Sequence, residues 1–238
     1  MAFPQVTSIT ETKTAVDGHH CVVDLPASVN AGDLLLLIHS AEGAVTALDT
    51  APAGWTEKHN GLYSKGIALV YVKVAEAGDA GGTAEIILTG DAVGWAAQVY
   101  RITAWGGGVA DVEKSSFLHA SISTFMNPPS LTASWGSADN LWIAALCNAD
   151  DDEYPLAWST DYTDGLSSLT GGGGNGGGSV NSCRRERAVD TEDPASMGMT
   201  NTALGYALTI VVKPATAAVG ASGVANENRR RMRTHLTR

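Results

Sequence analysis

The sequence has few of the patterns that identify an enzyme or a metalloprotein. Its three cysteines (Cys21, Cys147 and Cys183) are odd in number and widely spaced, and no CxxC or HxxxH spacing favours zinc. No GxSxG nucleophile elbow is present. We therefore expect no cofactor and no metal. Cys21 and Cys147 lie in apolar runs, so we expect them to be buried free thiols.

Targeting signals are missing as well. No apolar run reaches the roughly 18 residues that a membrane-spanning helix needs. The first residues, MAFPQVTSITETK, lack the basic segment followed by an apolar segment that marks a secretory signal. We therefore expect the protein to be synthesised in a cytoplasm and to make no contact with a membrane.

Charged residues are also scarce, at 17%, and no window shows an apolar stripe of helical period across three turns. The sequence is instead rich in glycine (27 residues), and 44% of its residues are apolar. A chain of 238 residues with this composition can bury a large core as one all-β domain. Short strands joined by many turns suit it better than long helices.

Strand-like runs of β-branched, aromatic and other apolar residues recur along the chain, bounded by Gly, Pro, Asn or Asp. They predict strands over residues 20–25, 34–39, 67–74, 83–89, 95–102, 118–125, 141–147 and 203–212. Their length and spacing are typical of sandwiches and barrels. The predicted fold is an antiparallel β-sandwich.

Two stretches of the sequence resemble each other. Residues 27–43 (ASVNAGDLLLLIHSAEG) and 133–150 (ASWGSADNLWIAALCNAD) each contain Ala-Ser, a polar turn, an apolar strand and a small polar exit. They lie about 106 residues apart, and an aromatic turn follows each of them, PAGWT at 52–56 and WSTDYT at 158–163. This repeat predicts two similar half-sandwiches.

Three segments depart from the strand pattern. Residues 171–178 (GGGGNGGG) predict a flexible loop, and residues 184–193 (RRERAVDTED) predict a charged, solvent-facing segment. Residues 215–225 (ATAAVGASGVA) follow Pro214 and contain no side chains that could form a core. We therefore expect a sandwich domain over residues 1–214, and a linker with an extended C-terminal arm over 215–238.

Some local patterns are weak indications of a binding or catalytic site. The spacing Gly171-x-Gly173-x-x-Gly176 matches a dinucleotide fingerprint, but no helix follows it. Asp150, Asp151 and Asp152 with Glu153 could bind Ca²⁺, although they lack the EF-hand alternation, and a solvated loop is the simpler interpretation. Twenty-five acidic residues leave a carboxylate pair of the glycosidase type open, so a hydrolase remains one alternative.

The six tryptophans divide into two groups. Trp95 and Trp142 lie in apolar strands and are predicted to be core residues. The other four lie in turns, where they either clamp the ends of the sandwich or stack on sugar rings. Among them, Trp55 and Trp158 are the candidates for contact with a glycan.

Charge is distributed very unevenly between the body and the C-terminal end. The last ten residues hold Arg229, Arg230, Arg231, Arg233 and Arg238 and no acidic residue, whereas the rest of the chain has ten basic and twenty-five acidic residues. A +5 arm on a −15 body predicts a negatively charged partner. DNA would be repelled by the body, so we expect the arginines to pair with carboxylates of another protein rather than with nucleic acid.

The order of four segments resembles a domain found in structural proteins of tailed bacteriophages. These segments are 25–36 (LPASVNAGDLLL), 52–56 (PAGWT), 71–75 (YVKVA) and 99–102 (VYRI). The resemblance covers residues 4–104 and extends to Pro214 through the closing strand. It implies a jelly-roll-like sandwich and a place on the virion, in head-fibre, decoration or tail-associated chains.

The sequence and the resemblance together predict a non-enzymatic virion protein. It would decorate or cement the capsid or be mounted on the tail, bind other virion proteins through the arm, and form a homo-oligomer. The alternative is a module that binds a host-surface glycan or receptor through its exposed loops.

Overall fold

The computed structural model describes residues 2–15, 18–64, 66–149, 154–170 and 176–216, with the side chains of 122 and 201–203 left out. Strands dominate this part of the chain, and its helical structure consists of two short 3-10 turns, Ala77–Asp79 and Val109–Asp111. All strand pairs are antiparallel. The predicted all-β sandwich is confirmed.

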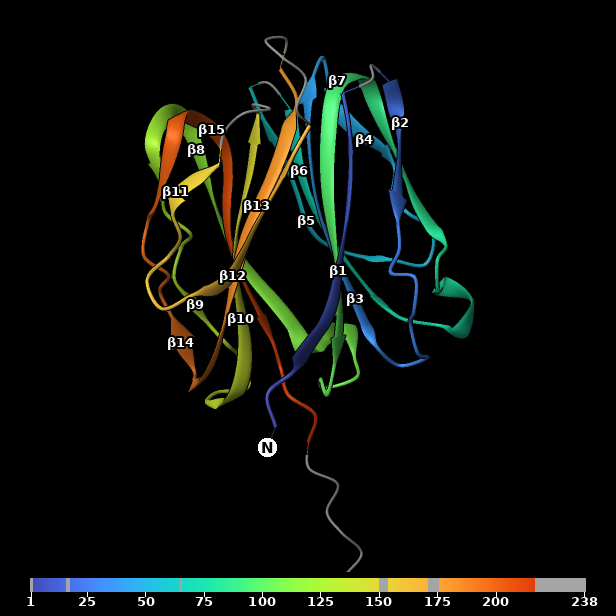
Figure 1. The fold of residues 1–238 in the computed structure, drawn as a ribbon, viewed down its shortest axis with the longest axis vertical. Coiled ribbons are helices and arrows are strands. Elements are labelled where there is room, and N and C mark those ends of the chain that lie inside the picture. Colours follow the sequence, from blue (N-terminus) through green and yellow to red (C-terminus); the bar gives the residue numbers. More distant parts are fainter. Residues whose placement is uncertain (1, 16–17, 65, 150–153, 171–175, 217–238) are drawn as a thin grey trace, which may run out of the picture.

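Each half of the chain builds its own sheet (Figure 1). The first has the order β1-β7-β3-β6-β5, and β2 and β4 also pair with β7. Its strands are β1 (Gln5–Thr14), β2 (Gly18–Asp24), β3 (Leu34–Gly43), β4 (Ala47–Thr50), β5 (Thr56–Tyr63), β6 (Gly66–Val74) and β7 (Thr83–Thr103). We call residues 5–103 the first unit.

The second sheet has the order β11-β15-β10-β13-β12, and β8 also pairs with β15. Its strands are β8 (Val112–Met126), β10 (Ala138–Ala149), β11 (Pro155–Ala157), β12 (Thr163–Leu169), β13 (Gly178–Val189) and β15 (Met197–Val212). Strands β9 (Leu131–Thr132) and β14 (Thr191–Glu192) form a separate small pair. We call residues 112–212 the second unit.

Both units have the nested strand pairing of a jelly roll. In the first, β1 pairs with the end of β7, β2 with the start of β7, and β3 with β6. In the second, the two parts of β8 pair with the two parts of β15, and β10 pairs with β13. The registers agree as well, because Leu34 of β3 lies opposite Ile102 and Leu141 of β10 lies opposite Val212. The two similar halves expected from the sequence are therefore two jelly rolls in tandem.

In each unit, one long strand belongs to two sheets. The first part of β7 pairs with β2 and β4 in a small outer sheet, and its last part joins the main sheet between β1 and β3. Strand β15 does the same in the second unit. Glycines lie near these transitions, Gly90 with φ +87° and Gly205 with φ +150°. The sequence therefore predicted two strands, over 83–89 and 95–102, where the structure has one bent strand.

The units pack against each other through their main sheets. Across the interface, β3 contacts β10, β1 contacts β12 and β5 contacts β8. One apolar cluster fills this interface, and each jelly roll has a second cluster beneath its outer sheet. The central strands β3 and β10 are consequently buried on both faces, which explains the unbroken apolar runs LLLLIH and LWIAALC.

A buried polar network also connects the units. Gln98 of β7 donates from Nε2 to Ser168 Oγ and to the carbonyl oxygen of Val180, both at 3.0 Å. The Ser182 hydroxyl donates to Gln98 Oε1 and is hydrogen-bonded to the Tyr100 hydroxyl. Because these groups are fully buried, they hold the two sheets in one relative position.

The segment 184–193 is largely exposed, as predicted, with one buried exception. Its first part belongs to β13, which lies between β10 and β12, and its Glu192 is only 2% exposed. Arg185 donates from Nη1 to Glu192 Oε1 (3.1 Å), and Arg187 donates from Nη1 to Oε2 (2.9 Å). Both arginines therefore pair with the one buried carboxylate of the segment, which offsets the cost of its burial.

Candidate functional site

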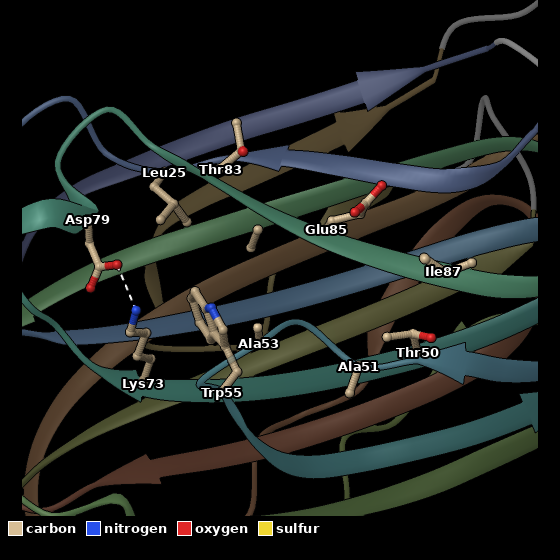
Figure 2. Close-up of a pocket in the computed structure, with 11 residues that line it drawn as sticks. Leu25, Thr50, Ala51, Ala53, Trp55, Lys73, Asp79, Thr83, Glu85 and Ile87 are labelled. Atoms are coloured by element: carbon tan, nitrogen blue, oxygen red, sulfur yellow. Dashed lines mark hydrogen bonds and ion pairs between the residues drawn. The ribbon is translucent and has the colours of Figure 1, made fainter.

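The first unit carries a pocket of about 300 Å³ beside Trp55 (Figure 2). It lies between the loop that joins β4 to β5 and the first part of β7. Its apolar lining consists of Leu25, Ala51, Ala53, Trp55, Ala84 and Ile87, and its polar lining consists of Thr50, Lys73, Asp79, Thr83 and Glu85. This mixture of an aromatic ring, small residues and a few polar groups is typical of small-ligand sites.

The pocket exists because β4 is shorter than β2. Both strands pair with the first part of β7, but β4 stops at the Thr50–Ile87 pair, whereas β2 continues to the Asp24–Thr83 pair. Residues 83–86 thus have a strand partner on one side only. Alternate residues of this stretch direct backbone N–H and C=O groups towards the β4 side, where the pocket lies.

The charges of the pocket are mostly paired. Lys73 Nζ lies 2.7 Å from Asp79 Oδ1, and both side chains are largely buried (16% and 12% exposed). Burial opposes ionisation of Asp79, but the Glu76 N–H and the Lys73 ammonium outweigh it and lower the pKa of this carboxyl group. Glu85 is half-exposed and is hydrogen-bonded to His20 Nδ1 at 2.7 Å.

The two tryptophans proposed for glycan contact occupy equivalent loops. Trp55 lies between β4 and β5 and packs on the core of the first unit, and Trp158 lies between β11 and β12 and packs on the core of the second. Both are half-buried. Their surroundings differ, because Trp55 lines the pocket whereas the Trp158 indole lies against Gly165, where a Cβ would overlap it. Glycan contact by either residue remains a prediction.

The other tryptophans are structural. Trp95 and Trp142 are buried, as predicted. Trp105 is also buried, and its indole donates to the carbonyl oxygen of Gly32 (2.9 Å). Trp135 donates to Asn140 Oδ1 (3.0 Å). These contacts follow the clamping interpretation of turn tryptophans.

The remaining candidate residues have no described position. Asp150, Asp151 and Asp152 lie outside the described residues, as do all five arginines of the arm. The last described segment, up to residue 216, is attached to the connection between the two units through a hydrogen bond from Ala215 N to Ala104 O (3.0 Å). The boundary at Pro214 therefore stays a prediction. Among the described residues, no group of three His, Cys, Asp or Glu side chains could hold a metal ion.

Buried titratable groups also occur elsewhere in the described residues. All three cysteines are free and buried, as expected for two of them, and burial raises the pKa of Cys21 and of Cys183 to about 12. Such thiols are poor nucleophiles. His39 is fully buried, and burial lowers its pKa to about 3.

Sequence reasoning identified Trp55 but not the polar residues around it. Lys73, Asp79 and Glu85 come from three separate segments of the chain, so only the tertiary structure brings them together. Lys73 had one available signal, since a single lysine interrupts the apolar run of residues 67–74.

Comparisons with family models, with curated proteins and with solved structures find no match for this chain. In the described ranges, no helix is both long and apolar enough to cross a membrane.

Proposed function

We propose that this chain is a non-enzymatic structural protein of a bacteriophage particle, where it decorates or cements the capsid or is mounted on the tail. The observation that carries the proposal is the role of the residues that resemble phage structural domains. Arg101 Nε donates to Asp33 Oδ2 at 2.6 Å, and the two side chains are largely buried. This pair joins the GDLLL segment to the VYRI segment, so the shared residues maintain a framework.

Further contacts support a framework role for the same segments. Asp33 Oδ2 also accepts the Asn30 N–H (2.8 Å), which fixes the turn before β3. The Asp33 carbonyl oxygen accepts the Ala75 N–H (2.7 Å) at the end of the YVKVA segment. Three of the four motif segments thus meet at one corner of the first unit. Motif residues that make internal contacts suit a structural protein, because the function of such a protein depends on a fixed shape within an assembly.

The arm supplies the attachment in this proposal. Its five arginines would pair with carboxylates of a neighbouring capsid or tail protein, or of another copy of this chain in a homo-oligomer. The acidic body makes nucleic acid a poor partner.

Removing the arm tests the attachment. We expect deletion of residues 226–238 to leave the melting temperature of the purified protein unchanged but to abolish its incorporation into particles. Mass spectrometry of purified particles gives the copy number, and cryo-electron microscopy gives the location. Wild-type attachment should weaken as salt rises, because charge pairs between proteins are screened. Absence of the full-length protein from purified virions would refute the structural role, and normal incorporation of the truncated chain would refute the arm as anchor.

Binding of a host-surface glycan is the second candidate function. The pocket favours it, because a half-buried indole beside hydroxyl and carboxylate groups offers both a stacking surface and hydrogen-bond partners for a sugar.

A further inference from the structure

We infer that the Trp55 pocket binds a non-acidic pyranose, a sugar ring without a carboxylate. This inference rests on the glycan-binding function proposed above and adds the class of sugar and the residues that recognise it.

The shape of the pocket suits one or two sugar rings. Figure 2 shows the Trp55 indole in the middle, with the Lys73–Asp79 pair at one end and Thr50 and Ile87 at the other. The open edge of β7 between these ends is four residues long, roughly 13 Å at 3.3 Å per residue. This edge is short for a peptide strand, because β4 already occupies its continuation.

The polar groups that remain available suit sugar hydroxyls. No other described residue accepts a hydrogen bond from the Trp55 indole N–H, and alternate residues over 83–86 offer backbone donors and acceptors on the pocket side. The hydroxyls of Thr50 and Thr83 can both donate and accept. Hydroxyl groups of a pyranose also do both, so one ring can satisfy these groups while its apolar face lies on the indole.

The charges of the pocket disfavour an acidic ligand. Its cation, Lys73, is already paired with Asp79. Its remaining carboxylate, Glu85, shares a hydrogen bond with the half-exposed His20, so the described lining has one excess negative charge when His20 is neutral. A carboxylate on the ligand would meet this charge without a free cation to pair with. A neutral sugar avoids that repulsion, and an amino sugar would gain from it.

The experiment measures binding of the full chain to matched sugars by isothermal titration calorimetry. The probes are neutral galactose and glucose oligosaccharides and the matched oligogalacturonates. We expect at least one neutral oligosaccharide to bind, and the galacturonates to bind about ten-fold more weakly or not at all, a difference of about 1.4 kcal/mol. Trp55→Ala should weaken neutral binding by about ten-fold or more through loss of stacking.

Two further variants make the result specific. Phe125→Ala removes an exposed aromatic side chain of the second unit and should leave binding unchanged, and thermal melting shows whether each variant is folded. Glu85→Gln should reduce the difference in affinity between neutral and acidic sugars, because it removes the excess negative charge of the pocket. Galacturonate binding as tight as neutral binding, or neutral binding that survives Trp55→Ala, would overturn the inference.

The outcome separates this inference from both proposed functions. If the wild type binds none of the sugars yet is present on virions, the inference and the glycan function fall while the structural function stands. If a sugar binds with the expected dependence on Trp55 but virions lack the protein, the structural function falls alone. Sugar binding that is independent of Trp55 refutes the inference and leaves the glycan function in place.

Discussion

The outer sheets of the two units have the same strand pairing but different surfaces. In the first unit, the outer sheet presents His20 and Glu85 and borders the Trp55 pocket. In the second, it presents Phe125 and Leu156, which are 63% and 71% exposed. Two copies of one framework therefore offer different surfaces, with a pocket and an ion pair in the first unit and two large exposed apolar side chains in the second. The framework sets where a surface lies, and the outward side chains set its chemistry.

The interiors of the two units differ at single positions of the shared register. His39 of β3 lies opposite Ala97, and Leu146 occupies the equivalent place in β10, opposite Ala207. Both side chains are fully buried, but both ring nitrogens of His39 lack a hydrogen-bond partner. Asp33 and Asn140 also occupy equivalent positions, because they directly precede Leu34 of β3 and Leu141 of β10. A charged side chain in the first unit there corresponds to a neutral amide in the second. The His39–Leu146 pair isolates the cost of a buried polar group in an otherwise similar environment.

The largest effect should come from the bend that both units require. Gly205→Ala places a Cβ against the carbonyl oxygen of Cys147 at a φ of +150°, so we expect a loss of about 3 kcal/mol or more in the free energy of unfolding. Gly90→Ala should behave alike, because its Cβ would meet the carbonyl oxygen of Ala44. Urea denaturation measures both, with Gly136→Ala as a control in open space that shares a positive φ. Equal stability of Gly205→Ala and Gly136→Ala would show that the bend tolerates a side chain.

The next effect concerns the buried histidine. Its pKa is about 3 in the folded protein and about 6.5 when unfolded, so the unfolded state binds more protons between these values and stability falls as pH drops from 6.5 towards 3. At pH 5 this loss is about 2 kcal/mol relative to neutral pH. His39→Leu, which copies Leu146, should remove that part of the pH dependence.

Urea denaturation of wild type and His39→Leu at pH 7 and pH 5 checks this prediction. Some acid sensitivity should remain, because His59 is also buried and its pKa is lowered to about 4, by desolvation and by the nearby Lys114. Identical pH dependence of the two proteins would contradict a neutral, buried His39 in the folded state.

The smallest effect should come from the ion pair of the first unit. Asp33→Asn keeps an acceptor for the Asn30 N–H but removes the charge that Arg101 faces, so we expect a loss of about 1 kcal/mol. Asp24→Asn is the control, because Asp24 is exposed. Thermal denaturation of both variants provides the comparison, and a loss no greater than that of the control would show that the pair adds no stability.

Part of this fold could be predicted from the sequence because some strands are buried on both faces. Strands β3, β6 and β10 read as continuous apolar runs, and each was expected close to its observed position. Strand β13 was missed, since its sequence GSVNSCRRERAV consists of mostly small residues followed by a charged run. The burial of its first half depends on partners distant in the chain, such as Gln98 for Ser182.

The candidate site could be predicted only in part, for a similar reason. The PAGWT turn marked Trp55 as a residue in an aromatic loop. The pocket beside it results from the early end of β4 and from the Lys73–Asp79 pair, both of which depend on strand register. A pattern of residue types carries no information on where a neighbouring strand stops.

The sequence by itself determined the all-β class, the internal repeat, the burial of the central strands and the uneven charge of body and arm. These properties depend on local composition and on the period of apolar residues, which act over a few neighbouring residues. Only the tertiary structure decided that the repeat forms two jelly rolls packed face to face and that Trp55 rather than Trp158 lines the described pocket. Those outcomes depend on contacts between residues far apart in the chain, and strand pairing fixes such contacts only once the whole sheet has formed.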